Sequence, residues 1–252
     1  MSTIPPVAVR LVKGSFLFFP VLAVLLWFGT VLGFWGALYL AFLLELLPAL
    51  AVAQLPMVDD EGPLPRTPVY LSSAAVILGV GLVGLLVGRR EFGWEAMGLV
   101  GARWELVVPW TVGLSLGALF LLFSFLLLRR TFGLRESPLL VQLLPKTGKE
   151  KAVFVFLSMA AGLGEEVAFR GYLMPALTQL FGWEWGAALL SSGVFGLLHA
   201  YQGWLGILRT ALLGLVLAAS FIVSGVLWPA ILAHAILDII AGLVLGETLV
   251  RE

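Results

Sequence analysis

The feature that most constrains this chain is the length of its uncharged stretches. From Gly14 to Val58 the only charged residue is Glu45. A transmembrane helix needs about 20 consecutive apolar residues, so this stretch is too long for one crossing and suits two, with a turn near Gly33–Gly36. Over the whole chain 61% of residues are hydrophobic and 12% are charged, whereas soluble domains average about 25% charged. The sequence therefore predicts a membrane protein.

Further apolar stretches alternate with polar connections along the chain. We expect the later spans at 69–88, 106–128, 152–180, 185–199, 205–224 and 228–245. The connections are a loop at 59–68, a loop or interfacial segment at 89–105, and a long polar connection at 129–151. The predicted fold class is all-α, a polytopic transmembrane helix bundle of about eight spans, with seven as the alternative.

Charge and composition exclude several classes of function and suggest an orientation. The net charge is zero and the chain has no cysteine, so nucleic-acid binding, disulfides and thiolate chemistry are not expected. Counting eight spans places most Lys and Arg residues on the side of the N-terminus, against Arg89, Arg90 and Arg103 on the other side. Because cytoplasmic loops carry the excess of Lys and Arg, we expect both termini in the cytoplasm. The small size and the lack of a targeting signal favour a bacterial plasma membrane, with the lipid bilayer as partner.

The apolar part of the chain is interrupted most strongly by Gly-Glu-Glu-Val-Ala-Phe-Arg at 164–170. A charge at mid-bilayer costs about 2.5–3.5 kcal/mol, so such residues are candidates for function. Glu166 and Arg170 are four residues apart, share a helix face and can pair. Glu165 lies about 100° around the helix, without that partner. A carboxyl group in such surroundings is suited to act as a general base near neutral pH.

The two histidines of the chain, His199 and His234, follow these acidic residues. Asp238 is four residues after His234, and Phe195 is four residues before His199, so each pair shares a helix face. Two kinds of chemistry fit this set. One is a divalent metal such as zinc, held by imidazole and carboxylate ligands; its ligands would be Glu165, His199, His234 and Asp238. The other is direct activation of water by Glu165, with His234 and Asp238 orienting or stabilising the reacting carbonyl. Both lead to hydrolysis.

Three motifs occur in order in the C-terminal half. They are Glu165-Glu166-x-x-x-Arg170, Phe195-x-x-x-His199 and His234-x-x-x-Asp238. This pattern resembles the CPBP (ABI) intramembrane proteases, which include the type II CAAX prenyl endopeptidases. The resemblance implies a helical bundle with a polar chamber open toward the cytoplasmic side. It also implies residues 1–150 as N-terminal transmembrane helices with a cytoplasmic connection, and residues 151–252 as the catalytic core.

The resemblance further implies a role for each residue of the motifs. Glu165 would activate water, and Glu166 and Arg170 would hold the site together. His199 and His234 would line the chamber as base partner, metal ligand or oxyanion donor. The family is described both as metalloproteases and as metal-free glutamate proteases. The substrate would be a peptide or protein, with lipidated or membrane-anchored substrates and CAAX-type processing as the expected class.

The last motif often ends in Asn in this family, whereas this chain has Asp238. An Asn amide can donate to an oxyanion, but an ionised Asp cannot. Asp238 is therefore protonated, orients His234 or binds a metal. We also expect Arg209, near the start of the stretch 205–224, to extend its side chain to the membrane interface.

Two other classes of function use the same residues differently. Buried carboxylates and histidines also serve ion-coupled or proton-coupled membrane transporters, although the inverted repeats common in transporters are not visible in this sequence. A non-catalytic membrane scaffold, or a bacteriocin-immunity-type protein, would tolerate replacement of the polar residues with effects on stability alone. We expect the endopeptidase, and the resemblance is the main reason for that choice.

Overall fold

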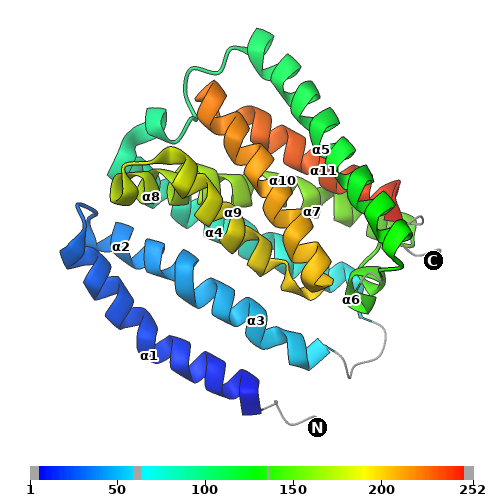
Figure 1. The fold of residues 1–252 in the computed structure, drawn as a ribbon, viewed down its shortest axis with the longest axis horizontal. Coiled ribbons are helices and arrows are strands. Elements are labelled where there is room, and N and C mark those ends of the chain that lie inside the picture. The colour runs from blue at the N-terminus through cyan, green and yellow to red at the C-terminus, as the bar shows by residue number, and fades with distance from the viewer. Residues whose placement is uncertain (1–5, 59–63, 135–136, 247–252) are drawn as a thin grey trace.

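The computed structural model describes residues 6–58, 64–134 and 137–246, and within these ranges the chain is helical without any strand (Figure 1). Its elements are α1 (Pro6–Gly29), α2 (Phe34–Ala41), η1 (Phe42–Leu46), α3 (Leu47–Val58), α4 (Arg66–Ala96), α5 (Trp104–Phe132), α6 (Pro138–Gln142), α7 (Gly148–Glu166), η2 (Val167–Leu173), α8 (Met174–Phe181), α9 (Glu184–Leu198), η3 (Ala200–Gln202), α10 (Gly203–Ser224) and α11 (Trp228–Leu243). The predicted all-α bundle is confirmed. Part of the predicted loop 59–68 lies outside the described residues.

The eight predicted apolar segments are all helical, but they differ in length. Among the described residues, six are long and apolar enough to cross a membrane. These six are Pro6–Gly29, Phe34–Leu55, Arg66–Ala96, Trp104–Phe132, Gly148–Phe181 and Ala200–Ser224. The other two, α9 and α11, have 15 and 16 residues. At about 1.5 Å per residue they reach about 22 and 24 Å, less than the hydrocarbon core of about 30 Å.

The polar segment predicted at 89–105 is more ordered than a loop. Helix α4 continues through it to Ala96, and Gly93, with φ of 79°, breaks the regular helix there. The carboxylate of Glu91 accepts a hydrogen bond from the backbone N–H of Gly33 at 3.0 Å. This contact joins the end of α4 to the turn between α1 and α2.

Helix α7 packs against both α4 and α11, and small residues allow it to approach them closely. A Cβ on Gly164 would lie 2.6 Å from the carbonyl oxygen of Ile77 in α4. A Cβ on Gly162 would lie 2.6 Å from the carbonyl oxygen of Ile231 in α11. Both distances are too short for any residue with a Cβ atom at these two positions. The next residue, Glu165, is therefore held where three helices meet.

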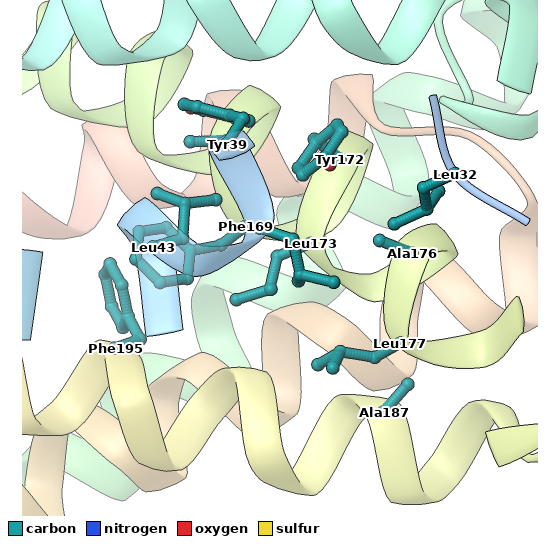
Figure 2. Packing of buried hydrophobic residues seen from close by; sticks show 12 residues of the cluster. Leu32, Tyr39, Leu43, Phe169, Tyr172, Leu173, Ala176, Leu177, Ala187 and Phe195 are labelled. Atoms are coloured by element: carbon teal, nitrogen blue, oxygen red, sulfur yellow. The ribbon is translucent and has the colours of Figure 1, made fainter. Parts of the chain in front are cut away.

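The π-helical segment η2 directly after α7 forms the centre of the hydrophobic core. Figure 2 shows its side chains beside those of α2, η1 and α9, namely Phe169, Tyr172 and Leu173 with Tyr39, Leu43 and Phe195. Tyr39 and Tyr172 pack edge to face with ring centroids 4.7 Å apart, and Phe169 and Phe195 do so at 5.2 Å. Such aromatic pairs add to the energy of apolar burial and fix ring orientation. Phe195 is held in this way from the core side.

Candidate active site

Glu166 and Arg170 form an ion pair at the junction of α7 and η2. Oε1 of Glu166 lies 2.8 Å from Nη1 of Arg170, and neither side chain is exposed. Nη2 of Arg170 donates to the carbonyl oxygen of Gly214 in α10 at 2.8 Å. The guanidinium group also lies over the ring of Phe195, 4.8 Å from its centroid. The pair expected from the four-residue spacing is therefore present, and it joins α7 to α9 and α10.

His234 in α11 extends this network. Its Nδ1 lies 2.8 Å from Oε1 of Glu166, the same oxygen that accepts from Arg170. An ionised carboxylate can only accept, so Nδ1 carries the hydrogen of this bond. The other ring nitrogen, Nε2, lies 3.6 Å from Oε2 of Glu165 and 3.7 Å from Oδ2 of Asp238. Two carboxyl groups thus face one imidazole nitrogen, at distances slightly longer than a hydrogen bond.

The exposure of these side chains shows where the cluster is open. The side chains of Glu166 and Arg170 are fully buried, and that of His234 is 9% exposed. Glu165 is 18% exposed and Asp238 is 41% exposed. The network therefore runs from a sealed ion pair to two carboxyl groups that are partly exposed.

His199, the residue after α9, joins the cluster through Phe195. Its Nδ1 lies 2.9 Å from the carbonyl oxygen of Phe195, which can only accept, so Nδ1 donates and Nε2 remains available. The ring of Phe195 packs against His199 with centroids 4.9 Å apart, and against His234 at 5.9 Å. Both histidines therefore lie on the same aromatic ring.

The structure brings the sequence-predicted residues together in two parts. Glu165, Glu166, Arg170, His234 and Asp238 form one chain of polar contacts, and His199 is linked to it by the ring of Phe195. Across the described ranges, no group of three or more His, Asp or Glu side chains is placed to hold a metal ion. The metal ligation of Glu165, His199, His234 and Asp238 stays a prediction.

Sequence reasoning did not identify three polar residues next to His199. The rings of Tyr201 and His199 lie 5.9 Å apart. Nε2 of Gln202 donates to the hydroxyl of Tyr201 at 3.1 Å, and Nη2 of Arg209 donates to Oε1 of Gln202 at 2.9 Å. The expectation that Arg209 extends to the membrane interface is wrong, because it is 6% exposed and turns back toward η3. Arg209 is the only charged residue in the apolar stretch 205–224, and this isolation could have indicated a buried polar partner.

The C-terminal part of the chain is similar to a known protein family. Residues 148–240 match the model of the Type II CAAX prenyl endopeptidase Rce1-like family. This range begins at the first residue of α7 and ends within α11, so it contains all three motifs. The resemblance predicted from the motifs is confirmed for this segment. Comparison with curated proteins and with solved structures gives no match.

Proposed function

We propose that this Rce1-like membrane protein is an intramembrane endopeptidase in which Glu165 activates water for hydrolysis of a peptide bond near the membrane surface. The observation that supports this most is the convergence of Glu165 and Asp238 on Nε2 of His234, beside a sealed ion pair. The family match favours CAAX-type processing of a peptide or protein, lipidated or membrane-anchored, as the substrate class.

The reaction can be written with the groups of the cluster alone. Glu165 takes a proton from water while the water oxygen bonds to the carbonyl carbon of the scissile peptide. The π electrons of the carbonyl move onto its oxygen and form an oxyanion. When the C–N bond breaks, the carbonyl re-forms and the leaving amine takes the proton from Glu165. The carboxylate is then regenerated, and one water molecule has been consumed.

The buried part of the cluster positions His234 for this reaction. Arg170 is fixed by Gly214 and Phe195, and it holds Glu166 in place. Glu166 accepts a hydrogen bond from Nδ1 of His234, and this bond directs Nε2 toward Glu165. A supporting group that fixes the tautomer and orientation of a histidine is a general requirement of such sites.

Asp238 and His199 complete the proposed site. Asp238 also faces Nε2 of His234, at 3.7 Å, so of its three possible roles the orientation of His234 agrees best with the contact. His199 donates through Nδ1 to a backbone carbonyl, which leaves Nε2 as the nitrogen that can face water or substrate. We assign His199 as the partner of the base.

The broader organisation also remains a proposal. We infer that residues 151–252 form the catalytic core and residues 1–150 the N-terminal membrane helices with a cytoplasmic connection. The asymmetry of Lys and Arg supports both termini on the cytoplasmic side. We also propose a bacterial plasma membrane as its location.

The proposed function is tested with the purified full chain in detergent and in liposomes. The probe is a farnesylated peptide ending in a C-a-a-X sequence, and mass spectrometry detects the released fragment. Glu165→Gln is expected to lower kcat by about 10²–10⁴-fold while the thermal unfolding temperature stays unchanged. The matched control is Glu105→Gln, at an exposed glutamate in the first turn of α5, which should keep full activity.

The alternatives give different results in the same preparation. A Glu165→Gln protein that cleaves as fast as the wild type contradicts the assignment of the base. Absence of cleavage together with a proton flux that Glu165→Gln abolishes would indicate a transporter. Absence of both activities, with the polar residues freely replaceable, would indicate a scaffold.

A further inference from the structure

The contact between Arg209 and Gln202 fixes the direction of a short hydrogen-bond chain. A guanidinium group has donors and no acceptor, so the atom of Gln202 that it contacts at 2.9 Å is the amide oxygen. The amide nitrogen of Gln202 must then face the opposite way. It lies 3.1 Å from the hydroxyl oxygen of Tyr201.

The second contact determines what the Tyr201 hydroxyl can do. Because Gln202 donates, the phenol oxygen of Tyr201 accepts, and its own hydrogen is left for another group. Among the described residues no acceptor for this hydrogen is found. A donor chain that starts at a cation also polarises the hydroxyl and strengthens the bond that it can donate. Tyr201 is therefore a directed donor without a partner in the described structure.

The backbone places this donor beside the catalytic cluster. Tyr201 belongs to the 3₁₀ turn η3, which begins directly after His199 and is closed by the Gln202 N–H bonding to the His199 carbonyl at 2.9 Å. The ring of Tyr201 lies against the His199 ring.

The proposed reaction needs such a donor, because the predicted site residues offer few. The ring N–H of neutral His199 is used by the Phe195 carbonyl. In His234, Nδ1 donates to Glu166, and Nε2 faces the carboxyl groups of Glu165 and Asp238. An ionised Asp238 cannot donate. Nη1 of Arg170 donates to Glu166 and Nη2 donates to the Gly214 carbonyl, and the whole side chain is buried.

We propose that Tyr201, oriented by Arg209 through Gln202, donates a hydrogen bond to the oxyanion that forms on the substrate carbonyl. This inference rests on the proposed peptidase function. The phenol hydrogen stays on Tyr201 throughout: the bond strengthens as the carbonyl oxygen gains its electron pair and weakens when the C–N bond breaks and the carbonyl re-forms. Tyr201 thus provides the donor that an Asn at position 238 would otherwise supply.

The first test removes the hydroxyl and keeps the ring. Loss of one oxyanion donor typically costs about 10²–10³-fold in kcat, so Tyr201→Phe should lose about this much, with KM changed less than about twofold. The matched control is Tyr39→Phe, because the Tyr39 hydroxyl donates to the Val80 carbonyl in the core. It should keep the kcat of the wild type.

The second test reverses the hydrogen-bond chain without removing Tyr201. In Gln202→Glu the carboxylate still accepts from Arg209, but it has no N–H for Tyr201 and instead accepts the phenol hydrogen. The hydroxyl is thereby turned away from the substrate, and kcat should fall as far as in Tyr201→Phe. Adding Tyr201→Phe to Gln202→Glu should cause no further loss. A residue with only a packing role would not show this pattern, because both variants preserve the packing.

The outcomes separate the inference from the function on which it rests. A wild type that cleaves the farnesylated peptide, a Glu165→Gln that does not, and a slow Tyr201→Phe support both. A Tyr201→Phe with unchanged kcat, or with a change confined to KM, overturns the inference and leaves the peptidase in place. A wild type that cleaves nothing overturns the peptidase and this inference together.

Discussion

His234 donates from Nδ1 to Oε1 of Glu166 across 2.8 Å, and this bond joins α11 to α7 inside the bundle. It explains why the two adjacent glutamates of the first motif differ. Glu166 is fully buried and accepts from two donors, whereas Glu165 makes no hydrogen bond within the described residues and reaches the open side of the cluster.

Glu166→Gln should destabilise the protein far more than Glu165→Gln does. It removes one charge of a sealed ion pair and leaves Arg170 uncompensated, and breaking such a pair costs about 3–5 kcal/mol. Thermal unfolding in detergent, followed by circular dichroism, should show a clear loss of Tm for Glu166→Gln alone. Equal Tm values for the two variants would contradict the division of roles.

Gly214→Ala should disturb the site from the side of α10. An added Cβ would lie 2.8 Å from Nη2 of Arg170 and 3.2 Å from the Phe195 ring. Overpacking of this kind costs about 1–3 kcal/mol, so both Tm and kcat should fall. Gly193→Ala on α9 is the control, because its Cβ would meet nothing within 4 Å. If both variants behave alike, the packing around Arg170 is not the reason for a glycine at 214.

Activity should survive removal of metal ions. Among the described residues, no group of three or more His, Asp or Glu side chains is placed to hold a metal ion. Cleavage of the farnesylated peptide should therefore be unchanged after dialysis against EDTA, in parallel with a zinc protease that loses its activity. Inactivation by EDTA that zinc reverses would show that these side chains rearrange around a metal.

The orientation in the membrane can be tested with single thiols, because the chain has no cysteine. Arg103 and Lys149 are both exposed and lie at the starts of α5 and α7. In intact cells an impermeant maleimide should label Arg103→Cys, whereas Lys149→Cys should react only after the membrane is opened, because the excess of basic residues stays in the cytoplasm. The reverse pattern would invert the proposed topology.

Much of the site could be predicted because it depends on local geometry. The pairs Glu166–Arg170 and His234–Asp238 each lie one helical turn apart in an apolar segment, so their contact follows from helical spacing and from the scarcity of charge there. The expectation about Phe195 and His199 also depended on a four-residue spacing, and their rings do pack together.

The remaining features depend on contacts between distant segments. Nη2 of Arg170 donates to the backbone carbonyl of Gly214. Every residue has such a carbonyl, so the sequence does not indicate which one accepts. Arg209 was expected at the interface because a basic residue near a span end usually extends outward, but Gln202 provides it with a partner inside the protein. The π-helical geometry of η2 also departs from the regular spacing on which sequence periodicity is based.

The two apolar helices that are too short for a full crossing are those that lead to His199 and carry His234. A segment of about 22–24 Å in a hydrocarbon core of about 30 Å is matched only if the lipid around it thins or polar groups and water take up the remaining depth. Either adjustment brings the aqueous boundary toward the carboxyl groups of Glu165 and Asp238. The shortness of α9 and α11 would thus give the proposed hydrolytic site access to the water that its reaction consumes.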